Sequence, residues 1–221
     1  MATWKIAPAL AAGNTVVLKP AEQSPMSAIR LAELFVRAGG PPGVFNFGNG
    51  MGETAGKALA LHDDVAKISF TGSTEVGKLI LQYAGQSNMK RVALECGGKS
   101  PQIFMADLPN LADAVDAAYN GVFANMGEVC SAGSRLLVER TVADAFTVAV
   151  TEAAEALRVG DPLVLENHVG AINSEAQLVQ NINFVRQAVA NGVHVATGGG
   201  AILADTGGTY MAPTVLTGVG P

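Results

Sequence analysis

Long apolar runs, cysteine-rich motifs and clusters of basic residues are all missing from this 221-residue chain. No window approaches the ~20 consecutive apolar residues that a membrane-spanning helix needs. Lysine and arginine total 14 against 19 acidic residues, and they are scattered along a chain whose formal net charge is −5. These absences argue against a membrane protein and against binding to nucleic acid phosphates or anionic membranes.

Cysteine is scarce, because only Cys96 and Cys130 are present. Two distant thiols make neither a disulfide framework nor a zinc site, and they suit a reducing compartment, so we predict a cytoplasmic protein without a metal site. Residues 1–13 resemble a secretion signal only loosely, because their short apolar run contains Pro8 and follows a single lysine. We therefore predict no signal peptide.

What the chain does have is 49% hydrophobic residues, arranged in alternating strand-like and helix-like segments. In the first half, short β-branched or apolar runs alternate with stretches of helical periodicity. The expected strands are residues 15–18, 44–47, 66–70 and 91–95, and the expected turns with helices are 24–40, 48–64 and 71–85. This alternation predicts a parallel β-sheet covered on both faces by helices, in which ligands bind at the strand ends.

The second half continues the alternation with a different character. We expect helices at 110–126, 141–158 and 174–191, and strands at 134–139, 193–199 and 212–218. The turn at Cys96–Gly98 is the best candidate for a domain boundary, which divides the chain into 1–96 and 97–221. Both parts have the usual size of a domain.

Three loops in the first half could bind a dinucleotide, and each also has a simpler explanation. The segment FTGSTEVG at 70–77 places Gly72 and Ser73 between a strand and a helix, which suits a pyrophosphate but also describes an ordinary helix N-cap. GNGMGETAG at 48–56 is an imperfect glycine motif that includes Gly52. Lys19 and Glu22 follow a strand, where a carboxylate could bind a ribose diol or simply face solvent.

The two thiols and one acid are the candidates for chemistry. Cys130 lies among small residues in MGEVCSAGS, where an exposed thiolate would be a nucleophile, although a lone cysteine is more often a small buried hydrophobe. Cys96 has the same alternatives. Glu95 ends the apolar run VALE, so it is either a general base or half of a surface salt bridge.

Taken together, these segments resemble one family, the NAD(P)-dependent aldehyde dehydrogenases. LECGGKSP at 94–101 is similar to the family's glutamate signature, and FANMGEVCSAGSR at 123–135 is similar to its cysteine signature. Further similarity, in the family's order, extends over essentially the whole chain. It includes WKIAPALAAGNTVVLKPAEQSP, KISFTGSTEVGK and GGTYMAPTVL. The sequence of residues 86–111 is most similar to that of the family branch that acts on aminoaldehydes.

The resemblance implies a fold and a role for each candidate. The fold would be a Rossmann-type parallel sheet with part of an α/β catalytic domain, truncated at both ends. Cys130 would attack the aldehyde to form a thiohemiacetal and then a thioester, and Glu95 would activate the water that hydrolyses it. The resemblance places NAD, or alternatively NADP, against seven residues: Lys19, Glu22, Gly52, Gly72, Ser73, Val76 and Cys96. Glu22 favours NAD, because a carboxylate repels a 2′-phosphate.

Departures from the family pattern limit what this chain is expected to do alone. Family members are about twice as long and homo-oligomeric, and the resemblance implies that an oxyanion-hole asparagine, a ribose-binding glutamate and subunit-pairing strands lie outside these residues. Glu128 stands where glutamine is commoner. We therefore expect the isolated chain to oxidise its substrate, a small aldehyde of which an aminoaldehyde is one candidate, weakly or not at all. The rival interpretations are a non-catalytic dinucleotide-binding remnant and a cofactor-independent hydrolase that uses Cys130.

Overall fold

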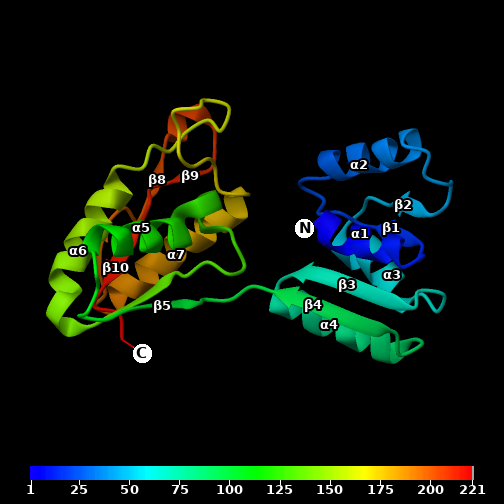
Figure 1. Ribbon diagram of the computed structural model, residues 1–221, viewed down its shortest axis with the longest axis horizontal. Helices are drawn as coiled ribbons and strands as arrows, with labels where there is room; N and C mark the ends of the chain where they lie inside the picture. The colour runs from blue at the N-terminus through cyan, green and yellow to red at the C-terminus, as the bar shows by residue number, and fades with distance from the viewer. Residues whose placement is uncertain (221) are drawn as a thin grey trace. The chain divides into compact units, whose positions relative to one another are not determined.

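The computed structural model describes residues 1–220 of the chain (Figure 1). These residues form two compact units, Met1–Gly97 and Gly98–Pro221. The division follows Gly97, one residue beyond the boundary that the sequence suggested. Both units mix helices with strands, so the expected α/β class is confirmed.

The first unit alternates strands and helices along its whole length. In chain order its elements are α1 (Ala2–Ala11), β1 (Val16–Leu18), α2 (Met26–Arg37), β2 (Phe45–Phe47), η1 (Gly52–Gly56), α3 (Lys57–Leu61), β3 (Lys67–Gly72), α4 (Thr74–Gln86) and β4 (Arg91–Cys96). The strands form two parallel pairs, β1 with β2 and β3 with β4. The predicted parallel pairing is therefore present, but as two pairs rather than one continuous sheet.

Helices α2 and α4 connect the two strands of each pair, as parallel strands require, and α2 packs on β2 while α4 packs on both β3 and β4 (Figure 1). Phe35 of α2 meets Phe45 of β2 edge to face, with 5.7 Å between ring centroids. Helix α1 lies in a segment to which no element was assigned from the sequence, and it contains Pro8. The helix nevertheless forms and buries Ile6, with α1 packed on β1.

The β3–β4 pair brings two candidate segments to the same edge of the unit. The register pairs Thr71 with Glu95 and Gly72 with Cys96, so both strands end side by side. Helix α4 begins immediately after β3, and its N-terminus is therefore at that edge too. The FTGS turn and the LECGG segment, 20 or more residues apart in sequence, become neighbours through this register.

The second unit contains a parallel pair, two antiparallel pairs and three long helices. Its elements are β5 (Pro101–Phe104), α5 (Leu111–Phe123), η2 (Ala124–Gly127), β6 (Arg135–Val138), α6 (Arg140–Glu155), α7 (Glu175–Ala190), β7 (His194–Thr197), β8 (Ala201–Ile202), η3 (Ala204–Thr206), β9 (Tyr210–Met211) and β10 (Val215–Thr217). Strand β5 pairs with β6 in parallel, whereas β7 with β10 and β8 with β9 are antiparallel.

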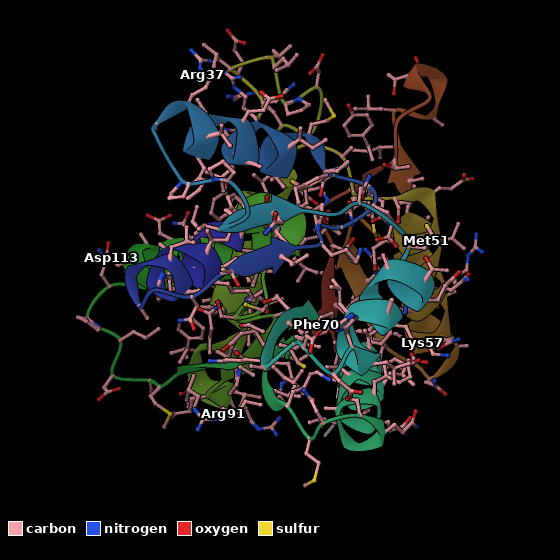
Figure 2. The ribbon with its side chains drawn as sticks, turned by 90° about the vertical axis from the view of Figure 1, so that its right-hand side faces the viewer. Arg37, Met51, Lys57, Phe70, Arg91 and Asp113 are labelled. Carbon is pink, nitrogen blue, oxygen red and sulfur yellow. The ribbon has the colours of Figure 1, made fainter. Side chains whose placement is uncertain are left out.

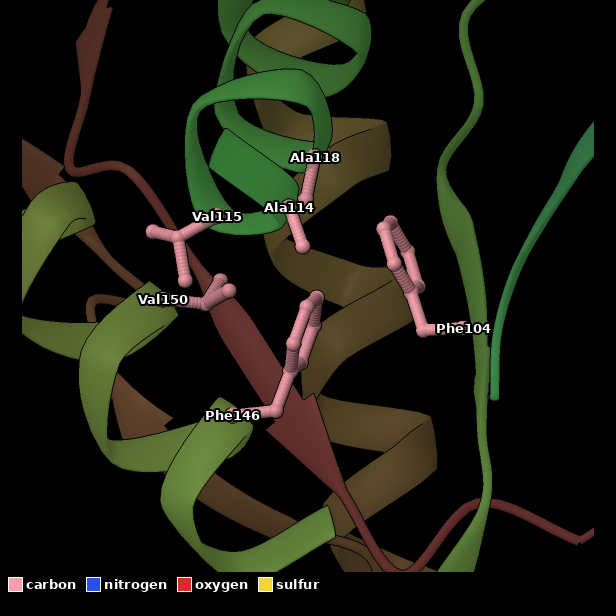
Figure 3. Close-up of a cluster of buried hydrophobic side chains, with 6 residues drawn as sticks. All are labelled: Phe104, Ala114, Val115, Ala118, Phe146 and Val150. Carbon is pink, nitrogen blue, oxygen red and sulfur yellow. The ribbon is translucent and has the colours of Figure 1, made fainter. Parts of the chain in front are cut away.

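A compact apolar core holds α5 and α6 against β5 (Figure 3). The rings of Phe104 and Phe146 lie 4.4 Å apart between centroids, and Phe146 is almost completely buried. Small residues on α5 leave room for this contact. Ala118 is fully buried, so α5 packs closely on this core. The packing of α5 positions its C-terminal end and the loop that follows it.

Candidate active site

Lys19 lies just after β1 and holds three acceptors at once. Its ammonium Nζ donates to the carbonyl oxygens of Pro20 at 2.7 Å and Gly50 at 2.9 Å, and to the Glu22 carboxylate at 3.3 Å. Its aliphatic stem runs beside Gly56, where an added Cβ would lie 3.7 Å from the Lys19 Cδ and Cε atoms. Lys19 therefore joins the loop after β1 to the glycine-rich turn before α3.

The Glu22 carboxylate is kept ionised by its surroundings. A hydrogen bond from its own backbone, and then the hydrogen bond from Lys19, hold the pKa of Glu22 below the ordinary value of 4.5. The side chain of Glu22 is 36% exposed, against 17% for Lys19. An ionised carboxylate accepts hydrogen bonds and donates none, so Glu22 offers a fixed acceptor to a hydroxyl-bearing ligand.

Gly52 begins the π-helical turn η1, between Met51 and Lys57 (Figure 2). No atom lies within 4 Å of the position that a Cβ on Gly52 would occupy. The glycine is therefore not required by packing inside this unit. The space beside its backbone is open to a ligand.

Gly72 and Ser73 form the turn from β3 into α4. A Cβ on Gly72 would collide with the tip of the Phe70 ring (Figure 2). The Ser73 hydroxyl accepts a hydrogen bond from the Val76 N–H at 3.2 Å, so the expected N-cap is present. The cap satisfies one N–H of the first turn, and helix geometry leaves its other N–H groups without partners inside the helix. Val76 is 40% exposed beside them.

Cys96 ends β4 with its sulfur turned toward α4. The Sγ atom lies 3.4 Å from the place of a Cβ on Gly77, which is a buried helical glycine. The thiol is half-buried and free. Its sulfur therefore fills space between β4 and α4, and the backbone of Cys96 is left at the strand end opposite Gly72.

Glu95 precedes Cys96 and is exposed, with no ion pair among the described residues. The surface salt bridge that the sequence left open is therefore absent from this part of the chain. The register partner of Glu95 is Thr71, whose Oγ1 accepts a hydrogen bond of 2.6 Å from Lys5 Nζ. This long-range contact was missed from the sequence, in which Lys5 is an isolated cation in an unassigned segment.

Cys130 lies in the second unit, in the loop between η2 and β6. Its residue is exposed and its thiol is free. The preceding backbone is unusual, because Asn125 and Met126 have positive φ angles of 50° and 58°, followed by Gly127 at 73°. Left-handed backbone at two consecutive non-glycine residues costs free energy and is frequently found at functional sites. The exposure disfavours the interpretation of Cys130 as a small buried hydrophobe.

Each unit thus holds a different part of the predicted site. The residues expected to bind a dinucleotide, together with Glu95, belong to Met1–Gly97, whereas Cys130 belongs to Gly98–Pro221. Sequence reasoning also missed Gln102 of β5, whose amide Nε2 donates to the Gly133 carbonyl at 2.9 Å, three residues after Cys130. A polar residue at the start of a strand offered no signal for that contact.

No helix within residues 1–220 is long and apolar enough to cross a membrane. Within the same range, no group of three or more His, Cys, Asp or Glu side chains is gathered as a metal site would require.

Comparison with known families decides the relationship. The model of the aldehyde dehydrogenase family matches residues 1–221, which is the entire chain. The chain belongs to the aldehyde dehydrogenase family. The resemblance inferred from the glutamate and cysteine signatures is therefore confirmed.

Several characterised members of the aldehyde dehydrogenase family are similar over the whole chain. Retinal dehydrogenase 2 of Mus musculus is 47% identical over 219 residues, covering 99% of this chain and 42% of its own length. Aminoacetaldehyde dehydrogenase of Pseudomonas aeruginosa is 46% identical over 221 residues, covering 100% and 44%. The chain thus spans less than half the length of the curated relatives it matches.

Solved structures of aldehyde dehydrogenases agree with the fold. An indole-3-acetaldehyde dehydrogenase in complex with NAD⁺ is 50% identical and superposes with a TM-score of 0.98, over 100% of this chain and 44% of that one. The γ-glutamyl-γ-aminobutyraldehyde dehydrogenase of Burkholderia cenocepacia J2315 is 53% identical with a TM-score of 0.94, over 98% and 43%. Relatives of the aminoaldehyde branch are thus among those found, as expected.

Proposed function

We propose that this chain supplies the nucleophile, the general base and most of the dinucleotide contacts of an NAD-dependent aldehyde dehydrogenase. The exposed free thiol of Cys130, on a left-handed loop within the family's cysteine signature, is the observation that carries the proposal. The reaction is the oxidation of an aldehyde to a carboxylic acid. Because the chain spans 42–44% of its relatives, the proposal also holds that the chain alone turns over weakly or not at all.

Cys130 begins the reaction by adding its sulfur to the aldehyde carbonyl carbon. The new C–S bond converts the carbonyl into a thiohemiacetal, whose oxygen takes up a proton. Loss of the aldehydic hydrogen as hydride, together with release of the hydroxyl proton to water, leaves a thioester on Cys130, and a nicotinamide dinucleotide would supply the oxidising power for this step. A thiolate suits this step because it is a strong nucleophile that later departs readily.

Glu95 completes the cycle by removing a proton from water. The resulting hydroxide attacks the thioester carbonyl, the C–S bond breaks, and the acid leaves Cys130 free as a thiolate. General-base assistance typically contributes roughly 10²–10⁴ in rate. Glu95 suits this role because it forms no ion pair in the described residues and lies at the end of β4, beside the edge expected to hold the dinucleotide.

The residues present fit a dinucleotide at that edge. The first turn of α4 has N–H groups free for a pyrophosphate, with Ser73 already used as the cap. Space beside Gly52 is open, and the Glu22 carboxylate is fixed by Lys19 as an acceptor for a ribose diol. The negative charge of the Glu22 carboxylate disfavours a 2′-phosphate and supports NAD over NADP, and the lowered pKa of Glu22 agrees with an ionised group.

The proposed substrate is a small aldehyde, with an aminoaldehyde as the preferred class. Similarity to an aminoacetaldehyde dehydrogenase and to a γ-glutamyl-γ-aminobutyraldehyde dehydrogenase supports this preference. A retinal dehydrogenase at comparable identity shows how broadly the family's substrates vary. Two free thiols suit a reducing compartment, so the proposal places the enzyme in the cytoplasm.

The decisive experiment restores the rest of an enzyme around this chain. A chimaera would carry residues 1–221 in place of the matching 44% of the Pseudomonas aeruginosa aminoacetaldehyde dehydrogenase. Aldehyde-dependent NADH formation is expected from the chimaera and should disappear with Cys130→Ala. The neighbouring Ser131→Ala is the matched control. Unchanged turnover with Cys130→Ala would contradict the proposal, and NAD binding without any turnover would favour the dinucleotide-binding remnant.

A further inference from the structure

The loop that carries Cys130 is attached to the second unit at both of its ends. We call residues 124–134 the nucleophile loop. Neither attachment uses Cys130 itself, and neither was expected from the sequence. Together these two attachments restrain the position of the thiol relative to the helices of this unit.

Gln102 of β5 holds the C-terminal end of the nucleophile loop. Its Nε2 donates to the Gly133 carbonyl at 2.9 Å and lies 3.4 Å from the Ala118 carbonyl, while the Gly133 N–H donates to the Gly121 carbonyl at 2.9 Å. A Cβ on Gly121 would lie 2.7 Å from Gln102 Nε2, and one on Gly133 would lie 2.6 Å from Gln102 Cγ. The amide therefore fits between two glycines that provide its space.

Asn125 and Glu128 shape the N-terminal side of the loop. The Asn125 amide Nδ2 donates to the Glu128 carbonyl at 3.1 Å, and the Glu128 N–H donates back to the Asn125 carbonyl at 3.0 Å. This reciprocal pair closes the left-handed turn that ends two residues before Cys130. These two hydrogen bonds explain how the strained left-handed backbone persists, because they stabilise the turn.

The Glu128 side chain then ties this turn to a different helix. Its Oε1 accepts a hydrogen bond of 3.0 Å from the Asn173 N–H, 45 residues away along the chain. Asn173 immediately precedes Ser174, the N-cap of α7, whose hydroxyl accepts from the Gln177 N–H at 3.2 Å. The turn before Cys130 is thereby connected to the capped start of a 16-residue helix.

We infer that Glu128 and Gln102 are positioning residues that hold the Cys130 thiol for attack on the aldehyde. This inference rests on the proposed function, because it takes Cys130 to be the nucleophile. The hydrogen bonds that hold the nucleophile loop do not depend on that function. Displacement of a nucleophile by about 1 Å can cost on the order of 10² in rate, so a loop fixed at both ends suits this task. Glu128 acts through the backbone that it fixes, and it takes no part in the chemistry.

Glu128 offers the sharper test, because it is exposed and its replacement leaves the core intact. Glu128→Gln keeps a side-chain oxygen that can accept from the Asn173 N–H, whereas Glu128→Ala removes it. Glu152, exposed on α6, supplies the matched Glu152→Ala control. Gln102→Ala tests the second attachment.

Hydrogen exchange measured on the whole chain tests whether Glu128 holds the nucleophile loop, and this measurement does not require turnover. Glu128→Ala should speed exchange at Asn173 and across 125–132 about tenfold, as expected for the loss of one hydrogen bond to a charged acceptor. Glu128→Gln and Glu152→Ala should remain within about twofold of the parent chain, since both keep that bond. Equal exchange in the Ala and Gln variants would overturn the inference.

Turnover in the chimaera separates positioning from simple structural support. Glu128→Ala and Gln102→Ala should each lower kcat about tenfold with an unchanged KM for NAD, and Glu128→Gln should restore kcat, as expected when only the geometry of the nucleophile is disturbed. Full kcat in Glu128→Ala despite faster exchange would overturn the positioning role. Turnover that survives Cys130→Ala would refute the proposed function instead, and the exchange result would still decide whether Glu128 holds the loop.

Discussion

Thr71 and Glu95 are register partners at the carboxyl ends of β3 and β4, and Thr71 accepts a 2.6 Å hydrogen bond from Lys5 of α1. The ammonium thus connects an N-terminal helix to the strand that lies beside the proposed base. A contact that is expected to stabilise the first unit is therefore adjacent to Glu95 of its candidate site. It also provides the first prediction.

Lys5→Met should destabilise the first unit, because it leaves the Thr71 hydroxyl without its donor while keeping most of the apolar stem. We expect the free energy of unfolding to fall by about 1.5–3 kcal/mol, the usual worth of a hydrogen bond that involves a charged group. Urea unfolding followed by the fluorescence of Trp4, the single tryptophan and a neighbour of Lys5, measures this directly.

Two controls make the Lys5 result specific. Lys67→Met changes an exposed lysine of β3 and should leave stability within about 0.5 kcal/mol of the parent. In a double-mutant cycle, Thr71→Val should cost little once Lys5 has been replaced. Additive effects of the two substitutions would show that the Lys5–Thr71 contact contributes nothing.

Glu95→Gln should separate the two halves of the proposed reaction. The amide cannot take a proton from water, so hydride transfer continues while hydrolysis of the thioester slows by roughly 10²–10⁴. Stopped-flow absorbance of the chimaera should then show a burst of one NADH per site followed by slow turnover. Glu33→Gln, which alters an exposed carboxylate on α2, should leave both phases as they were. A variant with neither burst nor decline would exclude Glu95 as the base.

Glu22→Gln should weaken NAD binding by roughly 10-fold, because hydrogen bonds to an ionised acceptor are worth more than those to a neutral one. Binding of NADP should change less or improve, since the negative charge that opposes a 2′-phosphate is gone. Titration calorimetry with both dinucleotides measures the ratio of the two affinities. Glu33→Gln again serves as control, as it belongs to a comparable i,i+3 ion pair with Arg30.

The pH dependence of the Glu22 contribution follows from its lowered pKa. A carboxyl with a pKa below its unfolded value stabilises the native state above that unfolded value, and the stabilisation is lost as pH falls through the folded pKa. The contribution of Glu22 to folding should therefore be constant above pH 4.5 and decline below it. Comparing unfolding of the parent and Glu22→Gln from pH 3 to pH 7 tests this, and a difference that grows on acidification would contradict it.

Gly121→Ala should destabilise the second unit although alanine is the better helix former. The new Cβ would lie 2.7 Å from Gln102 Nε2, and that amide is enclosed by Gly133 on its other side. Overpacking of this kind costs about 1–3 kcal/mol. Gly85→Ala is the matched helical control, because nothing lies within 4 Å of its Cβ position. It should be neutral or stabilise α4 by up to about 1 kcal/mol.

Hydrogen exchange resolved by region measures both glycine substitutions in one experiment. Faster exchange of α5 in Gly121→Ala, with exchange of α4 unchanged or slower in Gly85→Ala, is the expected pattern. Adding Gln102→Ala to Gly121→Ala should recover part of the lost protection, because the clashing amide is then absent. Equal effects of the two glycine substitutions would show that the Gln102 amide yields without cost.

The alternation of apolar runs and helical periodicity was sufficient to predict the α/β class and most of the elements. Local rules explain this success. The Ser73 N-cap, and glycine at the end of α2 where Gly39 has φ of 89°, depend on neighbours in the sequence. Helix α1 was left unassigned from the sequence, and it forms with Pro8 inside it and Ile6 buried.

For the site, the sequence alone determined which residues are proposed to carry the chemistry, because segments similar to the family's signatures surround Cys130 and Glu95. Only the tertiary structure decided which of the two thiols is exposed and which side chains hold the nucleophile loop. The contacts made by Gln102, Glu128 and Lys5 span 31, 45 and 66 residues of chain. Such contacts depend on how helices and strands pack, and no local propensity encodes their partners.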